Sequence, residues 1–190
     1  MPLLLHWATK SVKIPVSVDF EAGYSSNPDQ VADYVKQLTE IGVVGINIED
    51  GIVENGKRVL GDSNDLSNKI KAIKAKTNVF INARTDTYTT KQPQALDEAI
   101  KRALEYEKAG ADAIFVPLIE SREDISTFIS NVQLPLNVFT TPNLPDYETL
   151  AQMGVKRISH GAKQYDLLLK KSSLIFEAFI RTKDYSIILK

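Results

Sequence analysis

The stretch "TEIGVVGINIED", Thr39 to Asp50, decides the fold. It runs from the end of a helix through a glycine into an apolar, β-branched segment that ends in polar residues. The same order recurs in "EKAGADAIFVPL" (107–118) and "AQMGVKRISHG" (151–161). A glycine that closes a helix takes the left-handed conformation, and here a strand follows at once. Three such junctions predict repeated βα units and therefore a parallel sheet.

Six segments are expected to be strands. Most are continuous apolar runs, which is typical of parallel strands covered by helices on their faces. Amphipathic helices are expected between them. The clearest begins after an Asn27 cap with Pro28 at its first position and stops at Gly42. A long C-terminal helix is expected from about Gln164 to Thr182. The expected strands are Val16–Glu21, Val43–Glu49, Val79–Arg84, Ala113–Leu118, Leu136–Phe139 and Arg157–Ser159.

Two α/β architectures fit six parallel strands. An open doubly wound sheet usually carries a glycine-rich phosphate loop after its first strand, and this sequence has none. A (β/α)8 TIM-type barrel places functional residues at the carboxyl ends of several strands, which is the pattern found here. A complete barrel needs eight strands and typically about 250 residues, whereas this chain has 190. The residues alone leave both α/β architectures open, and the length suits a single domain over residues 1–190.

Composition excludes several classes of function. The net charge of −1 gives no basic surface for nucleic acid or for an anionic membrane. The absence of cysteine excludes disulfides, thiolate metal sites and a cysteine nucleophile. No apolar run approaches the length of a membrane span, and the N-terminus lacks the features of a signal peptide. A cytoplasmic protein that binds neither nucleic acid nor membrane is expected.

Polar side chains gather at the ends of the first three expected strands. If these strands are neighbours, their ends form an acidic cluster beside one guanidinium. Carboxylate oxygens suit a hard cation such as Mg²⁺, and an arginine fork suits a carboxylate or phosphonate. Helix caps and structural ion pairs are the alternative interpretation of the same residues. The residues are Asp19 and Glu21, then Asn47, Glu49 and Asp50, then Asn82, Arg84 and Asp86.

Three phrases around these residues resemble the isocitrate lyase / phosphoenolpyruvate mutase superfamily. They are "PVSVDFEAGY" (15–24), "GVVGINIEDG" (42–51) and "FINARTDTY" (80–88), in that order. The later phrases "AGADAIFVPL", "PLNVF" and "LAQMGVKRIS" resemble further strands of the same barrel. The resemblance extends from about Ile14 to about Gly161.

The resemblance implies a site that binds Mg²⁺ (or Mn²⁺) and a small carboxylate substrate. Asp19 is then the closest metal ligand, while Glu21 and Glu49 hold metal-bound waters. Arg84 and Glu49 are the main catalytic candidates. Arg84 binds the substrate carboxylate or stabilises a developing oxyanion. Asp50 and Asp86 position their neighbours. Weaker candidates for lining the substrate are Asn47, Asn82, Tyr24 and Asn137.

The sequence departs from the family in two places. The superfamily's lyases carry a Lys-Lys/Arg-Cys-Gly-His loop, but here "GIVENGKRVLGDSNDL" (51–66) contains neither Cys nor His. Cysteine-dependent isocitrate or methylisocitrate lyase activity is therefore not expected. Lys57 and Arg58 lie in this loop, and two interpretations apply to them: closure over a substrate, or solvated loop charge, of which the second is favoured. Only 15 residues precede Val16, so the chain resembles strands three to eight of the barrel. Two strand edges would then lack their neighbours and invite pairing with another chain, and a homo-oligomer is expected.

The resemblance favours a lyase or mutase that acts on C–C or P–C bonds of a small 2-oxo or phosphono carboxylate, through an enolate-like intermediate. One alternative is a truncated, inactive barrel fragment or binding protein. Another is a barrel that a second chain completes. The residues that would identify the substrate lie in the divergent loop and in the units that the resemblance lacks.

Overall fold

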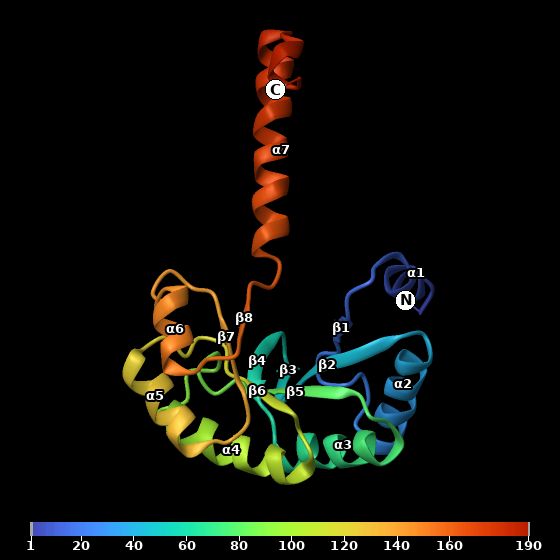
Figure 1. Ribbon diagram of the computed structural model, residues 1–190, viewed down its shortest axis with the longest axis vertical. Coiled ribbons are helices and arrows are strands. Elements are labelled where there is room, and N and C mark those ends of the chain that lie inside the picture. The colour runs from blue at the N-terminus through green and yellow to red at the C-terminus, as the bar shows by residue number, and fades with distance from the viewer. Residues whose placement is uncertain (1, 190) are drawn as a thin grey trace. The chain divides into compact units, whose positions relative to one another are not determined.

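The computed structural model describes residues 2–189, and within them six strands form one curled parallel sheet (Figure 1). The order across the sheet is β1-β2-β5-β6-β7-β8, so β1 and β8 are its edge strands. This confirms the predicted α/β fold with six parallel strands. The strands are β1 Val16–Asp19, β2 Val43–Glu49, β5 Phe80–Arg84, β6 Ala113–Phe115, β7 Leu136–Phe139 and β8 Arg157–Ser159.

Helices cover the outer side of the curled sheet, where α2 to α6 follow one another as a layer (Figure 1). Each lies between successive sheet strands along the chain, as the repeated βα units predict. Their apolar faces and the outward side chains of the strands form one core. The helices are α1 Pro2–Ser11, α2 Pro28–Glu40, α3 Ser63–Lys76, α4 Ala95–Ala109, α5 Arg122–Asn131 and α6 Tyr147–Met153.

Helix α2 shows why these segments fold locally as predicted. The Asn27 side chain caps it by accepting hydrogen bonds from the backbone N–H groups of the first turn, and Pro28 occupies the first position. Val31, Val35 and Leu38 recur at helical spacing and are buried. The chain then turns at Gly42, whose φ of 97° is the left-handed conformation that glycine tolerates.

Alternation along β2 separates the core from a polar face. Ile46 and Ile48 are buried against the helices. Their neighbours Asn47 and Glu49 point to the opposite side of the sheet, because successive side chains in a strand alternate. The inner face of the curled sheet is therefore polar toward the carboxyl end of β2.

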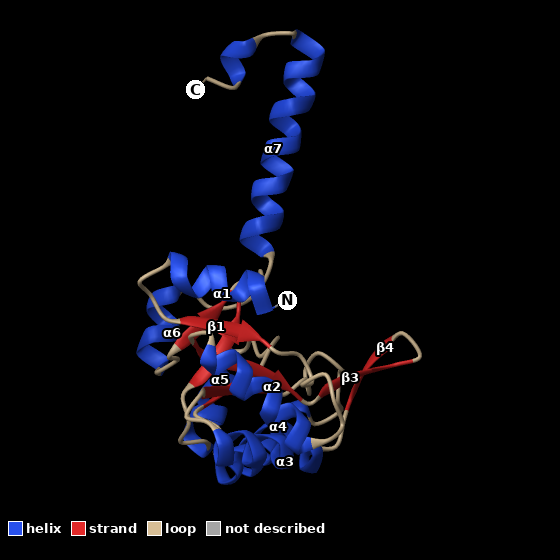
Figure 2. Cartoon of the chain, turned by 90° about the vertical axis from the view of Figure 1, so that its right-hand side faces the viewer, coloured by secondary structure: helices blue, strands red, loops and turns tan. Residues whose placement is uncertain are grey.

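The segment after β2 is a β-hairpin, whereas the sequence predicted a loop. Strands β3 (Gly51–Glu54) and β4 (Lys57–Leu60) pair antiparallel and extend away from the sheet (Figure 2). Asn55 and Gly56 connect them with φ values of 51° and 73°. Positive φ at both central residues defines a type I′ turn, for which Asn-Gly is the preferred pair.

Three strands are shorter than predicted. The first ends at Asp19, because the chain turns at Phe20–Gly23 and Glu21 adopts a φ of 49°. Asp19 and Glu21 are therefore not side chains on one face of a strand. The fourth ends at Phe115, since Pro117 has no N–H for a sheet ladder. The third begins at Phe80 rather than Val79.

The chain divides into two compact units, residues 1–158 and 159–190. The second contains α7 (Lys163–Thr182), the predicted long C-terminal helix, followed by the short 3₁₀ helix Tyr185–Ile187. Within this unit the rings of Phe179 and Tyr185 lie 5.4 Å apart. Across residues 2–189, no helix combines the length and the apolar character required to cross a membrane.

Candidate active site

Strand register brings most of the predicted site residues into two rows on the inner face of the sheet. Residues in register on neighbouring parallel strands point to the same face. The second row lies two positions further along each strand, nearer its carboxyl end. The first row is Asp19, Asn47 and Asn82, and the second is Glu49, Arg84, Phe115 and Asn137.

An amide pair occupies the first row. Nδ2 of Asn82 donates a 2.8 Å hydrogen bond to Oδ1 of Asn47. Asn82 is almost fully buried, and its own Oδ1 has no hydrogen-bond partner among the described residues. A buried acceptor of this kind is costly unless a water or ligand satisfies it. The pair therefore presents an unused polar atom at the site.

Four charged side chains form a closed cluster around the second row: Glu49 and Arg84 belong to the row, Asp86 follows β5, and Arg58 comes from β4. Arg84 is 2.8 Å from Oδ1 of Asp86 through Nη2 and 3.1 Å from Oε2 of Glu49 through Nη1. Arg58 contacts the same two carboxylates: Nε lies 2.5 Å from Oδ2 of Asp86, and Nη2 pairs with Oε1 of Glu49. Glu49 and Asp86 are buried. Two guanidiniums therefore balance two buried carboxylates, as buried charge requires.

Arg58 was predicted to be a solvated loop charge, and this was wrong. The hairpin register places Val53 opposite Arg58, and alternation then turns Arg58 toward Glu49 and Asp86. Its neighbour Lys57 is exposed, as predicted. The sequence also predicted one guanidinium beside the acidic residues, whereas the structure has two.

Gly51 allows the hairpin arginine to approach. A Cβ atom at this position would overlap Oδ2 of Asp86 and would lie 2.8 Å and 2.9 Å from two nitrogens of Arg58. Real Cβ atoms do not approach other atoms so closely, so any side chain here would displace the Arg58–Asp86 ion pair. The glycine is therefore required for close packing and not for a special backbone conformation.

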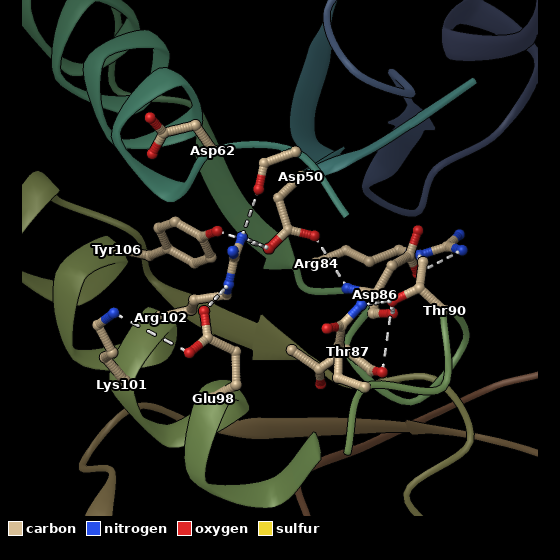
Figure 3. Close-up of polar contacts among 12 residues, drawn as sticks. Asp50, Asp62, Arg84, Asp86, Thr87, Thr90, Glu98, Lys101, Arg102 and Tyr106 are labelled. Carbon is tan, nitrogen blue, oxygen red and sulfur yellow. Dashed lines mark hydrogen bonds and ion pairs between the residues drawn. The ribbon is translucent and has the colours of Figure 1, made fainter. Parts of the chain in front are cut away.

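A buried network beneath the cluster centres on Asp50 (Figure 3). Its Oδ1 accepts a 2.9 Å hydrogen bond from the backbone N–H of Asp86. Its Oδ2 accepts hydrogen bonds from the Tyr106 phenol at 2.6 Å and from Arg102 at 3.1 Å. Arg102 also donates to the carbonyl oxygen of Gly61 at 2.9 Å. Asp50 thereby joins α4, the base of the hairpin and the turn that carries Asp86.

Burial determines the protonation behaviour of this network. It raises the pKa of Asp50, although the hydrogen bonds from Tyr106 and Asp86 oppose the rise. It also raises the pKa of Tyr106, and the negative charge of Asp50 adds to that effect. The phenol therefore stays protonated and remains a hydrogen-bond donor.

Sequence reasoning missed Tyr106 and Arg102. The apolar spacing in "PQALDEAIKRALEYEKAG" (93–110) predicts a stripe through Leu96, Ile100, Ala103 and Leu104. The buried face of α4 instead contains Ala99, Arg102, Ala103, Tyr106 and Ala109. The detectable signal was the i, i+4 spacing of Arg102 and Tyr106, which places both on one side of a helix. Their partner Asp50 lies more than 50 positions earlier, and no local pattern identifies it.

The remaining predicted metal residues lie at the open end of β1. Asp19 and Glu21 are both exposed. Loss of surrounding water raises the pKa of Asp19, the charge of Glu21 raises it further, and Arg84 and Arg58 lower it. Loss of water also raises the pKa of Tyr24, as do the charges of Glu21, Asp19 and Glu49, in that order. The three carboxylates that were predicted to act on a metal therefore all raise the pKa of the Tyr24 phenol.

Glu49 is the most perturbed carboxyl of the cluster. Burial raises its pKa to about 7, against the lowering effects of Arg84 and Arg58, and the charge of Asp86 adds to the rise. Its Oε2 has no hydrogen-bond donor within the described residues, although Nη1 of Arg84 is 3.1 Å away. Perturbed carboxyls that also have an unused oxygen are typical of functional sites.

The residues present fit Mg²⁺, without forming a complete cage for it. Within residues 2–189, no group of three or more His, Asp or Glu side chains is arranged to hold a metal ion. Mg²⁺ does not need such a group, because it keeps several waters and is usually held by one or two carboxylates with substrate oxygens. Asp19 supplies an accessible hard oxygen donor, and repulsion from Glu21 favours a cation there. The roles of Asp19, Glu21 and Glu49 toward a metal remain predictions.

A separate cavity of about 580 Å³ lies at the N-terminal end of α4. It contains none of the predicted strand-end residues. Arg102, which donates to Asp50, lies in its wall. The strand-end site is therefore distinct from this cavity, although the Asp50 network reaches both. The lining residues are Leu60, Gln92, Pro93, Gln94, Asp97, Glu98, Lys101 and Arg102.

Known proteins resemble this chain in sequence and in fold. An uncharacterized protein of Mycobacterium tuberculosis (strain CDC 1551 / Oshkosh) is 42% identical over 151 residues, which cover 79% of this chain and 55% of that protein. The crystal structure of a candidate phosphonomutase from Burkholderia cenocepacia J2315 has a TM-score of 0.84 at 32% identity, and covers 94% of this chain and 76% of its own.

A phosphonopyruvate hydrolase in complex with oxalate and Mg²⁺ shares the fold, with a TM-score of 0.82 at 22% identity over 97% of this chain and 67% of its own. The chain spans about half the length of the curated relatives it matches. The family model described as phosphoenolpyruvate phosphomutase matches residues 4–180. The chain therefore belongs to the phosphoenolpyruvate phosphomutase family of the isocitrate lyase / phosphoenolpyruvate mutase superfamily.

Proposed function

We propose that the protein is a Mg²⁺-dependent lyase or mutase. Its substrate is a small 2-oxo or phosphono carboxylate, in which it makes or breaks a C–C or P–C bond through an enolate-like intermediate. The observation that carries the proposal is the register of Glu49 with Arg84, two positions beyond the row that contains Asp19. This register supports the proposal because it brings carboxylate oxygens, which suit a cation, and a guanidinium, which suits an anion, to one end of the sheet.

Asp19 is assigned as the direct metal ligand, and Glu21 and Glu49 as the acceptors of metal-bound waters. Bound Mg²⁺ would supply Lewis-acid stabilisation of negative charge on the substrate oxygens. The solved phosphonopyruvate hydrolase holds Mg²⁺ together with oxalate, a small dicarboxylate. Family membership supports the same chemistry for this chain.

The chain's own residues orient the substrate and stabilise its charge. Arg84 is held by Glu49 and Asp86 and by its stacking over Phe115, 5.6 Å from the ring centroid. A guanidinium fixed in this way is organised in advance for an oxyanion, which is the arrangement that most lowers a barrier. The amides of Asn47 and Asn82 offer neutral hydrogen bonds beside it. Tyr24 and Asn137 are assigned to the walls of the site.

Two further parts of the proposal concern context. We place the enzyme in the cytoplasm and expect it to work as a homo-oligomer. The cysteine-bearing loop of the superfamily's lyases is replaced by the β3–β4 hairpin, which contains neither Cys nor His. The chemistry therefore relies on electrostatic stabilisation and not on a cysteine acid or base. The competing proposal is a binding protein that retains the site without turnover.

Titration calorimetry with Mg²⁺ and Mn²⁺ tests the metal assignment directly. Wild-type protein should bind one ion, and Asp19→Ala should abolish binding. Asp166→Ala, which removes an exposed carboxylate from α7, should bind as wild type does. A wild type that binds neither ion would refute the proposal.

A second experiment separates the enzyme from the binding protein. Phosphonopyruvate, oxaloacetate and substituted malates are incubated with the Mg²⁺-loaded protein, and products are followed by ³¹P and ¹H NMR. Turnover of one of them that disappears in Arg84→Ala supports the enzyme. Metal binding without turnover of any of them supports the binding protein.

A further inference from the structure

We propose that Arg58 of the β3–β4 hairpin binds an acid group of the substrate and makes the site selective for substrates with two acid groups. The inference rests on the proposed function and deepens it. The 2-oxo carboxylate end of the substrate belongs to the metal and to Arg84 in that proposal. The acid group at the other end, a carboxylate or a phosphonate, is assigned to Arg58.

The contacts of Arg84 hold it between two carboxylates. Nε and Nη2 lie 2.9 Å and 2.8 Å from Oδ1 of Asp86, and Nη1 lies 3.1 Å from Oε2 of Glu49. Of these three contacts only that of Nε is a hydrogen bond, whereas Nη1 and Nη2 are ion-paired by distance without hydrogen-bond geometry. Its face is covered as well, because it stacks over Phe115. Arg84 can therefore meet the 2-oxo carboxylate end of the substrate with its two Nη groups, and that contact leaves no nitrogen for a second acid group.

Arg58 is held by two hydrogen bonds, which leave one of its terminal nitrogens for a ligand. Nε binds Asp86 and Nη2 binds Glu49, but among the described residues Nη1 has no acceptor. Its side chain is 29% exposed, against 19% for Arg84. A guanidinium carries five N–H donors in a planar fork. The edge formed by Nη1 and the second hydrogen of Nη2 is therefore available, and it matches the two oxygens of a carboxylate or phosphonate.

The surrounding residues hold this edge in place. The Nε bond to Asp86 fixes the plane of the guanidinium, and Asp86 is itself held through its backbone N–H by Asp50. The backbone of Gly51 packs directly against this ion pair, since a Cβ atom added there would overlap Oδ2 of Asp86 and crowd two nitrogens of Arg58. A donor whose orientation is fixed before binding loses little entropy when the anion arrives. The hairpin thus presents Arg58 as a preorganised anion ligand.

Two pairs of acids test the proposal, because each pair differs by one acid group. Malate is compared with lactate, and oxaloacetate with pyruvate, by calorimetry in saturating Mg²⁺. Wild-type protein should bind the diacid of each pair about tenfold or more tightly than the monoacid, since a charge-assisted bidentate contact is among the stronger polar interactions. Arg58→Ala should reduce this ratio to about one by weakening the diacid alone.

Three further variants sharpen the result. Arg58→Gln keeps a polar side chain without its charge and should also reduce the diacid-to-monoacid affinity ratio to about one. Arg58→Lys keeps the charge without the planar fork and should retain part of the preference for diacids. Lys57→Ala removes the adjacent exposed charge and should leave the ratio unchanged. Circular dichroism and Mg²⁺ affinity verify that each variant is folded, and Arg58→Gln replaces Arg58→Ala if the latter does not fold.

The outcomes distinguish this inference from the function beneath it. If the Arg58 variants bind Mg²⁺ and keep the wild-type ratio, the role of Arg58 is wrong while the proposed function stands. If wild-type protein binds Mg²⁺ but does not prefer diacids, the selectivity is likewise wrong. If wild-type protein binds neither Mg²⁺ nor any of the four acids, both are wrong.

Discussion

The phenol of Tyr106 donates a 2.6 Å hydrogen bond to Oδ2 of Asp50, which lies 56 positions earlier in the chain. This bond connects the buried face of α4 to the residue that follows β2. The other oxygen of Asp50 accepts from the backbone of Asp86, and Asp86 binds both arginines of the site. A helix on the outer layer therefore helps to fix the geometry of the inner face.

Tyr106→Phe should destabilise the protein by about 1–3 kcal/mol, because it leaves a buried carboxylate oxygen with one donor fewer. Chemical denaturation at neutral pH measures the change in unfolding free energy. Tyr147→Phe, which alters an exposed tyrosine of α6, should change it by less than about 0.5 kcal/mol. Equal stability of the Tyr106 variant and wild type would mean that the phenol contributes nothing to the network.

Gly51→Ala should cost about 1–3 kcal/mol of stability, as overpacking of a filled site typically does. The added methyl overlaps Asp86 and crowds Arg58, so one of the two must move. Thermal denaturation gives the stability, and the Arg58 Nε–H resonance in a ¹H–¹⁵N NMR spectrum reports the broken ion pair. Val53→Ala, at an exposed position of the same strand, is the matched control. An unshifted resonance in Gly51→Ala would contradict the packing.

The pKa of Glu49 makes stability depend on pH. Burial raises it from an ordinary 4.5 to about 7, so the folded state retains a proton that the unfolded chain releases. The contribution of Glu49 to the unfolding free energy is therefore largest below pH 4.5 and is lost as pH rises through 7. In metal-free buffer, Glu49→Gln should gain stability relative to wild type between pH 5 and pH 8.

Urea titrations at several pH values measure this difference. Glu123→Gln, which changes an exposed residue in the first turn of α5, should run parallel to wild type across the range. Parallel profiles for Glu49→Gln and wild type would show that the arginines hold the Glu49 carboxyl ionised throughout.

Thermal stability should rise with the concentration of added metal and fall again when the metal is removed. An ion that binds only the folded state adds about 2.7 kcal/mol at one hundred times its dissociation constant. Mg²⁺ should therefore raise the melting temperature, and excess EDTA should return it to the starting value. Asp19→Asn should not respond to either. A melting temperature that rises equally in Asp19→Asn would assign the effect to another site.

Much of the sheet was predictable because its signals are local. The bounds of β2, β7 and β8 match the apolar runs, and the left-handed glycines Gly110 and Gly154 end α4 and α6 where the pattern indicated. The two rows of the site also follow from the sequence once these strands are assumed to be neighbours, because register and alternation then determine which side chains share a face. The end of β1 did not follow, because the positive φ of Glu21 has no marker in "DFEAGY".

The parts that were missed depend on pairings across the chain. The Asn55–Gly56 turn was detectable as a hairpin signal, yet the direction of Arg58 depends on which residue it opposes. The contacts of Arg102 and Tyr106 with Asp50 join segments that no periodicity relates. Local patterns identified the residues that carry charge at the strand ends, but not the partners that hold them.

The two-residue turn of the hairpin also sets a constraint of length. Side chains alternate along β4 with a period of two, so one residue inserted between Gly56 and Arg58 would turn the arginine to the other face. An insertion of two residues would point the arginine to the original face again, but two residues further along the strand. Activity across a series of turn lengths should therefore alternate between odd and even insertions. In engineering this hairpin, the number of residues in the turn is as important as the identity of the arginine that follows it.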